Sequence, residues 1–344
     1  MRYLSFLLPA LLLAFNGMPA LGLEPANPKA NAKARAILNY LDKLPTRDTG
    51  RTLSGQFTTC EKAGPTECQK TYQKTGHWPA MIGVDYADFA TGHLECQRAN
   101  RVALKYAKQG GWVTISAHVY NPARPKGSKL SRSQYDRGVD IRRILTPGDD
   151  LHQRWMEELD ILAEGLKELQ AADVVVLWRP FHEMNGAWFW WGRQDPDAFI
   201  KVWQHMFDYF TKTKGLDNLL WVYSPNHGEK TADYYPGDRY VDIVGLDAYT
   251  DFIDPQHIQG YEEVARLPKP FAFTEFGPHG SRNPPGDYDY LRFLSGIRKH
   301  FPKTVYFLAW SANWSLAQNR NTKELLEHPR IVNRDALLSA SASK

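Results

Sequence analysis

Eight short apolar runs, rich in β-branched or aromatic residues, recur along the 344-residue chain, and helical patterns separate most of them. This alternation predicts parallel strands joined by crossover helices, because a tight turn cannot connect parallel neighbours. The expected strands are Thr52–Phe57, Ala80–Tyr86, Trp112–Ala117, Val174–Arg179, Leu219–Tyr223, Ile243–Leu246, Pro270–Thr274 and Val305–Ala309. The clearest expected helices are Gln97–Lys108, Leu151–Leu169, Pro196–Lys212 and Tyr288–His300.

Eight such strands favour an α/β fold of one closed (β/α)8 TIM barrel over an open doubly wound sheet. The open sheet usually has a glycine-rich turn after its first strand, and Ser54-Gly55-Gln56-Phe57 has no such fingerprint. No Ser/Thr/Pro-rich tract or repeat divides the chain, so residues 23–344 are expected to form one catalytic domain. The long connection from Asn121 to Asp150 is interpreted as a loop over the barrel mouth.

The first 22 residues have the three parts of a secretory signal peptide. Met1-Arg2 precedes an uncharged apolar segment from Leu4 to Phe15, and small residues follow around Gly22. The apolar segment is too short to span a bilayer comfortably. We therefore expect a secreted protein, extracellular or periplasmic, after removal of residues 1–22.

Three cysteines remain in the mature chain, and an exported protein favours one disulfide among them. Cys60 and Cys68 would close a short loop, and Cys96 is an alternative partner for either. The pairing stays open, and three free thiols are the remaining alternative.

The formal net charge is +4, and acidic and basic residues are mixed along the chain. No basic block interleaved with aromatics favours nucleic acid, and no segment of the mature chain is apolar enough for a membrane span. The aromatic content is 13%, with 11 Trp, which suits stacking on a neutral polysaccharide. We expect a monomer that binds neither nucleic acid nor membrane.

The segment from Trp178 to Gly192 is the most informative for function. It follows the apolar run Asp173–Leu177 and carries an Arg, a His and a Glu, with four consecutive aromatic residues from Trp188 to Trp191. A core strand has no structural need to end this way. Aromatic faces stack on pyranose rings and a carboxylate supplies acid–base chemistry, so the segment indicates a sugar site.

A second carboxylate, Glu275, ends the apolar run that begins at Pro270 and lies 92 positions (275 − 183) after Glu183. Two glutamates at the ends of separate strands are what a glycosidase needs: one protonates the leaving oxygen, and the other attacks the anomeric carbon or activates water. Solvated surface charges are the alternative, but both residues lie inside apolar or aromatic runs.

Most of the other expected strands also end in polar or aromatic residues, and the catalytic groups of a barrel lie at those ends. These residues are Asp85, Tyr86, His118, Asn226, His227, Asp247, Tyr249, Trp310 and Trp314. A zinc motif starting at His182 fails because position 186 is Gly, and no Gly-x-Ser-x-Gly elbow occurs. We expect neither a metal nor a cofactor.

The segment Arg179-Pro180-Phe181-His182-Glu183-Met184-Asn185-Gly186, with Trp188 through Trp191, resembles the acid/base motif of glycoside hydrolase family 26, mostly β-mannanases. Thr274-Glu275-Phe276-Gly277 resembles the nucleophile strand of that family, and Asp247-Ala248-Tyr249 its sixth-strand motif. His118 and Trp310 fall where the family places active-site residues. The resemblance implies a retaining mechanism, with the acid after strand four and the nucleophile after strand seven.

These observations predict a role for each candidate residue. Glu183 is the acid/base, with a pKa raised by an apolar setting, and Glu275 is the nucleophile. Arg179 and Tyr249 are expected to orient Glu275. Four further residues are expected to bind the substrate. His118 and His182 would hydrogen-bond the sugar, and Trp188 and Trp310 would stack on it.

The function expected from the sequence is a secreted retaining endo-β-1,4-mannanase that hydrolyses mannan, glucomannan or galactomannan by double displacement. Two alternatives stay open. One is a β-1,3-xylanase or mixed-linkage β-glucanase of the same family. The other is a non-catalytic carbohydrate-binding barrel, which loss of Arg179 or either glutamate would favour; all three are present.

Overall fold

The computed structural model describes residues 22–45, 50–60, 66–88, 93–124, 139–279 and 285–337. The expected signal peptide, apart from Gly22, lies outside these residues, and so does the segment 125–138 of the long connection after Asn121. Both interpretations therefore stay predictions.

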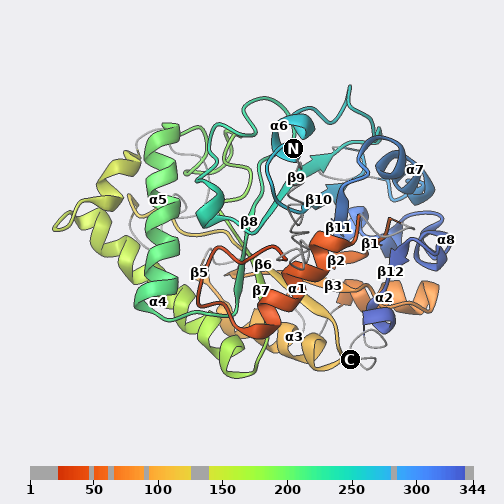
Figure 1. Cartoon of the computed structure of the whole chain (residues 1–344), viewed down its shortest axis with the longest axis horizontal. Coiled ribbons are helices and arrows are strands. Elements are labelled where there is room, and N and C mark those ends of the chain that lie inside the picture. The colour runs from red at the N-terminus through yellow and green to blue at the C-terminus, as the bar shows by residue number, and fades with distance from the viewer. Residues whose placement is uncertain are drawn as a thin grey trace, which may run out of the picture.

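A closed barrel of eight parallel strands forms the centre of the molecule, with helices around it (Figure 1). Each strand pairs with the next in chain order, and β11 closes the ring by pairing with both β10 and β2. The strands are β2 (Gly55–Phe57), β3 (Met81–Asp85), β6 (Trp112–Ala117), β7 (Val176–Pro180), β8 (Leu219–Tyr223), β9 (Ile243–Tyr249), β10 (Phe271–Gly277) and β11 (Thr304–Ala309). The predicted TIM barrel is confirmed.

The barrel strands fall on the eight predicted runs, with differences at their ends. The run Thr52–Phe57 is interrupted at Ser54, which donates from its backbone N–H to the Val332 carbonyl (3.0 Å). The first piece, β1 (Thr52–Leu53), consequently pairs with both β11 and β12 (Ile331–Val332). A short antiparallel pair, β4 (Ala87–Asp88) and β5 (His93–Leu94), follows β3.

The four predicted helices are present, and a side-chain cap marks where each of them starts, with Asp289 accepting from the Leu291 N–H at the start of α7. Glu95, Asp149 and Asp195 accept from backbone N–H groups in the first turns of α3, α4 and α5, which satisfies donors that a helix start leaves free. The predicted helix Pro196–Lys212 ends as α-helix at Asp208 and continues as a π-helical turn, Tyr209–Thr213. The α-helices are α1 (Ala32–Lys43), α2 (Thr66–Thr75), α3 (Cys96–Lys108), α4 (Asp150–Ala171), α5 (Pro196–Asp208), α6 (Tyr261–Ala265), α7 (Tyr290–His300) and α8 (Thr322–Glu327).

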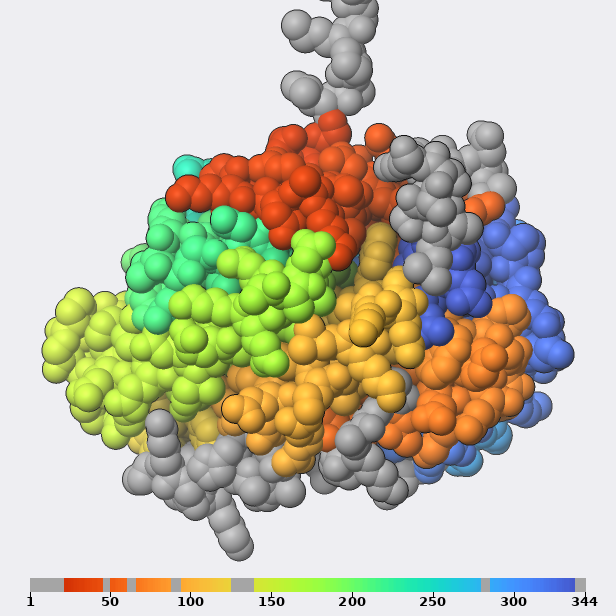
Figure 2. All heavy atoms as spheres, turned by 90° about the horizontal axis from the view of Figure 1, so that it is seen from below, coloured from red at the N-terminus to blue at the C-terminus, as the bar shows by residue number. Residues whose placement is uncertain are grey.

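Helix α1 packs on the end of the barrel where the strands begin. Its buried residues, among them Ile37, Leu38 and Leu41, share one apolar cluster with residues near the strand starts, such as Met81 and Ile243. Figure 2 shows this N-terminal segment, in red, covering one side of the molecule. The opposite end, where the strands finish, is left for the functional site.

The expected disulfide is absent: Cys60, Cys68 and Cys96 are all free thiols. Cys68 and Cys96 pack separately, because the Cys68 sulfur faces the Gln56 carbonyl of β2 and the Cys96 sulfur faces the Ile161 carbonyl of α4. Burial raises the pKa of the Cys60 and Cys96 thiols to about 12, so both stay protonated at neutral pH. Among the described helices, none combines the length and the apolar character needed to cross a membrane.

Candidate active site

Glu183 and Glu275 meet at the end of the barrel where the strands finish. Glu183 lies in the turn after β7, the fourth barrel strand, and Glu275 lies in β10, the seventh. One carboxylate oxygen from each, together with one from Asp247 of β9, lie within 4.8 Å of one another. The fold thus joins two glutamates that are 92 positions apart.

The Glu275 carboxylate is held by one cation and one hydroxyl. Arg179 donates from Nη2 to Glu275, and Tyr249 donates its hydroxyl hydrogen to the other oxygen (2.6 Å). Arg179 and Glu275 are both nearly inaccessible to solvent. A buried charge needs such partners, and these two fix the orientation of the Glu275 carboxylate.

Asp247 shares Arg179 with Glu275, which the sequence analysis did not predict. Arg179 Nη1 donates to Asp247 (2.8 Å), and the hydroxyls of Ser224 and Thr274 donate to its other oxygen (2.7 Å each). Burial raises the pKa of Asp247 to about 7, although the positive charge of Arg179 acts in the opposite direction. The signal in the sequence was the Asp-x-Tyr pair at the end of β9, where alternate residues share one face.

Glu183 has the electrostatic setting of a general acid. Burial raises its pKa well above the usual range, and the charges of Asp247 and Glu275 raise it further. The Trp188 indole N–H donates to its carboxylate and opposes that shift. Two neighbouring carboxyls in different surroundings separate into a proton donor and an ionised group, as acid and nucleophile require.

Two histidines lie beside the glutamates. The rings of His118 and His182 meet edge to face, with centroids 4.7 Å apart, and both contact Phe189. Asp85 at the end of β3 contacts His118 through Oδ2 (2.8 Å from Nδ1) and so orients that ring. Burial and the Arg179 charge hold the pKa of His182 well below its usual value, so this imidazole is neutral.

Of the predicted stacking residues, Trp188 is exposed and Trp310 is partly buried. Trp188 lies at the surface, with 43% of the residue exposed to solvent. Trp310 follows β11 and stacks on Phe57 of β2, with centroids 4.1 Å apart. Trp314 meets the Tyr249 ring edge to face. Tyr86 is not part of this group, because its hydroxyl donates to Asn100 of α3 within the core.

We expect Trp188→Phe to move the alkaline limb of the activity profile to higher pH. The lost indole N–H stabilises the ionised form of Glu183, so its removal raises the pKa of that carboxyl. An acid with a higher pKa stays protonated to higher pH, and the limb of kcat/KM follows it. The measurement is kcat/KM against pH for wild type and variant.

Trp310→Phe is the matched control, since it also shrinks an aromatic side chain near the site, but Trp310 stacks on Phe57 whereas the indole that donates to Glu183 is that of Trp188. The alkaline limb of kcat/KM for Trp310→Phe should stay at the wild-type pH even if kcat/KM itself falls. An unmoved or acid-shifted limb in Trp188→Phe contradicts this account of the Glu183 pKa.

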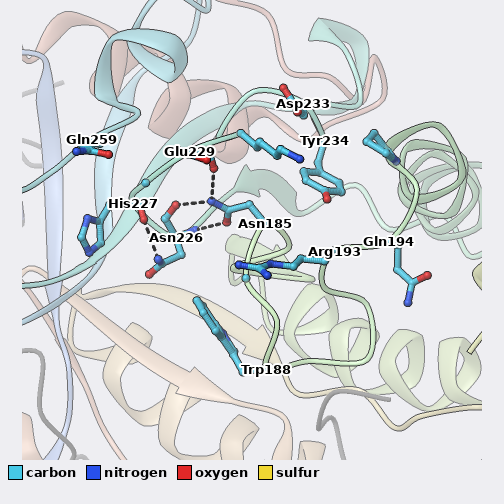
Figure 3. Close-up of a pocket in the computed structure, with 14 residues that line it drawn as sticks. Asn185, Trp188, Arg193, Gln194, Asn226, His227, Glu229, Asp233, Tyr234 and Gln259 are labelled. Carbon is cyan, nitrogen blue, oxygen red and sulfur yellow. Dashed lines mark hydrogen bonds between the residues drawn. The ribbon is translucent and has the colours of Figure 1, made fainter. Parts of the chain in front are cut away.

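A pocket of about 750 Å³ adjoins Trp188 and extends between the turn after β7 and the loop after β8 (Figure 3). Its lining is mostly polar and includes Arg193, Glu229, Lys230 and Tyr234. Lys, Arg and Glu side chains with amides and a Tyr offer many hydrogen bonds at short range. Such a lining suits a hydroxyl-rich ligand.

Glu183, Asp247 and Glu275 are also close enough to supply ligands to a metal ion. Arg179 already donates to Asp247 and Glu275, and its charge lies where a cation would otherwise balance the carboxylates. The expectation of no metal stays a prediction.

The fold and this pair of glutamates define a barrel of the glycosidase class. The glycosyl hydrolase family 26 model matches residues 26–336. A mannan endo-1,4-β-mannosidase of Bacillus subtilis is 39% identical over 94% of this chain and 92% of its own length. A solved structure of Bacillus subtilis mannanase superposes with a TM-score of 0.80 at 36% identity, covering 91% of this chain and 96% of that one. GH26A from Muricauda sp. MAR_2010_75 gives a TM-score of 0.76 at 30% identity over 90% and 99% of the two chains.

The chain belongs to glycosyl hydrolase family 26 and is a glycoside hydrolase. The predicted family is therefore confirmed, and the non-catalytic alternative is wrong. The individual residue roles proposed from the sequence remain predictions, which the contacts above support.

Proposed function

We propose that this chain is a retaining endo-β-1,4-mannanase that cleaves mannan, glucomannan or galactomannan. The observation that carries the proposal is the buried glutamate pair, in a chain similar over nearly its whole length to mannan endo-1,4-β-mannosidases. Glu183 gives its proton to the leaving oxygen while Glu275 attacks the anomeric carbon. Glu183 then removes a proton from the water that releases the sugar.

The spacing of the two carboxylates supports attack by Glu275 itself. Inverting enzymes keep their carboxyls roughly 6.5–9.5 Å apart to admit a water, whereas retaining enzymes keep them about 5–5.5 Å apart. One oxygen of Glu183 and one of Glu275 lie within 4.8 Å of each other, which is closer to the retaining arrangement than to the inverting one. The hydrogen bonds from Arg179 and Tyr249 orient the Glu275 carboxylate, which supports its role as the attacking group.

Aromatic and polar surfaces next to the glutamates favour a polysaccharide chain over a single sugar. Trp310, stacked on Phe57, offers a flat wall in the cleft. Trp188 borders the polar pocket between the loops after β7 and β8, which is large enough for further sugar units beside the cleavage point (Figure 3). His118 and His182 hydrogen-bond the ring being cleaved in this proposal, which the contact of their two rings next to Glu183 supports.

Proton NMR of the earliest product tests the mechanism. With β-mannan as substrate, we expect the β-anomer first and the α-anomer only later, through mutarotation. The α-anomer appearing first would overturn the retaining mechanism.

A panel of galactomannan, glucomannan, β-1,3-xylan and lichenan tests the substrate in a reducing-sugar assay. Preference for the two mannans is expected, with mixed oligosaccharides as early products of endo action. Preference for xylan or lichenan would overturn the mannan proposal and identify the protein as a xylanase or mixed-linkage glucanase that uses the same mechanism.

We also propose that the protein is exported after removal of residues 1–22, with no nucleic acid or membrane partner, and acts as a monomer. The support is the charged start, apolar segment and small residues of the leader. An intact mass of the exported protein that still includes residues 1–22 would contradict cleavage.

A further inference from the structure

The acid/base residue has an unfavourable backbone conformation. Glu183 has φ of +57°, in the left-handed region that residues with a Cβ rarely adopt. Such a conformation persists only where surrounding contacts hold it. The backbone N–H of Glu183 donates to the Ser224 carbonyl after β8 (2.7 Å), and the Gly186 N–H donates to the Glu183 carbonyl (2.9 Å). Other contacts made by the same turn therefore help to determine the position of the Glu183 side chain.

Asn185 supplies those contacts through its side chain. Its amide N–H groups donate to the carbonyls of Asn226 (2.8 Å) and Glu229 (3.1 Å), and its amide oxygen accepts from the Asn226 N–H (2.8 Å). Figure 3 shows the three bonds crossing from the turn after β7 to the loop after β8. Only this amide orientation satisfies all three partners, because two are acceptors and one is a donor.

The loop after β8, to which Asn185 is hydrogen-bonded, is in turn bonded to Asp247 on the nucleophile side of the site. Asn226 pairs with Asp247 in an isolated parallel bridge, and the His227 N–H donates to the Asp247 carbonyl (2.9 Å). Asp247 shares Arg179 with Glu275. The Asn185 amide thus completes a chain of contacts from the turn that carries Glu183 to the group that holds Glu275.

We propose that Asn185 is a positioning residue for the general acid, which sets the place of Glu183 relative to Glu275 through its three bonds to the loop after β8. This rests on the proposed function of the two glutamates. Proton transfer needs the acid within hydrogen-bond reach of the leaving oxygen, so a loosened turn weakens that step most.

The test compares two substrates in Asn185→Ala. On β-mannan, whose leaving group needs the acid, we expect kcat to fall by about tenfold to a hundredfold, a part of the contribution that general acid catalysis makes. With a dinitrophenyl β-mannooligosaccharide, whose leaving group needs little help, the first-turnover release of dinitrophenol should change less than about threefold. Asn185→Ser, which keeps one hydroxyl for the bridge, should fall between wild type and Asn185→Ala.

Gln170→Ala is a matched control. Its amide makes the same kind of bridge, to the Gly215 carbonyl (3.0 Å) and from the Asp217 N–H (2.6 Å), at the end of the barrel where β8 begins. That variant should lower thermal stability without separating the two substrates. An equal fall on both substrates in the Asn185 variants, or no fall in either, overturns the proposal.

Wild type measured alongside distinguishes this inference from the proposed function. If wild type cleaves a β-glycan other than mannan, the proposed substrate fails, and the same comparison is made with the dinitrophenyl glycoside of that sugar. If wild type cleaves none of the four polysaccharides, both proposals fail.

Discussion

Replacement of Glu275 by Ala reduces β-mannan hydrolysis by at least about a thousandfold, as expected where a covalent step is lost. The rate of polysaccharide hydrolysis by Glu183→Ala falls by a similar amount, since the leaving oxygen then departs without a proton. The two variants differ with a dinitrophenyl glycoside. Glu183→Ala still forms the glycosyl–enzyme and then stalls, whereas Glu275→Ala releases no burst of dinitrophenol.

Added azide separates the two roles by stereochemistry, because it attacks without help from a base. In Glu183→Ala it attacks the intermediate from the face opposite Glu275 and gives the β-glycosyl azide. In Glu275→Ala it enters the space that the carboxylate leaves and gives the α-glycosyl azide. The reverse pattern of products would exchange the assigned roles of Glu183 and Glu275.

Glu158→Ala is the control for loss of a buried glutamate, since Glu158 lies on α4 and is 2% exposed. Circular dichroism of all three variants checks the fold. Near-normal polysaccharide activity in a folded Glu183→Ala or Glu275→Ala protein contradicts the assignment.

Replacement of Arg179 by Met destabilises the protein by about 3–5 kcal/mol and abolishes activity. The guanidinium is 1% exposed and donates to both Asp247 and Glu275. Without it, two carboxylates remain buried side by side, and one must take up a proton or leave the interior. Denaturant unfolding at neutral pH, with kcat measured in parallel, gives both quantities.

Asp247→Asn is the informative partner variant, because it removes one negative charge and leaves Arg179 paired with Glu275. It should destabilise much less than Arg179→Met. Arg143→Ala removes an exposed arginine that also contacts two aspartates, Asp149 and Asp150, and should change stability little. Equal stability losses in Arg179→Met and Arg143→Ala would show that the buried contacts contribute no more than exposed ones.

The order of the strands and the places of the two glutamates in that order were predictable from the sequence. Each apolar run is a local property, and its period and length indicate a strand wherever it packs. Counting the runs placed Glu183 after the fourth and Glu275 at the seventh, as the barrel has them. The exact ends were less predictable: Ser54 interrupts the first run because its N–H bonds to Val332, 278 residues away.

The chemistry of the site depends on distances that only the tertiary structure fixes. The raised pKa of Glu183 comes from burial beside Asp247 and Glu275, which lie 64 and 92 positions further along the chain (247 − 183 and 275 − 183). The sharing of Arg179 joins residues from different strands, and the Asn185 bridge joins the turns that follow two of them. The expected disulfide failed for the same reason, since Cys68 and Cys96 pack against different elements and Cys60 is also a free thiol. Sequence determined which groups the barrel carries to its open end, and folding alone decided which of them touch, because charge and hydrogen bonding act over a few ångströms of space and not along the chain.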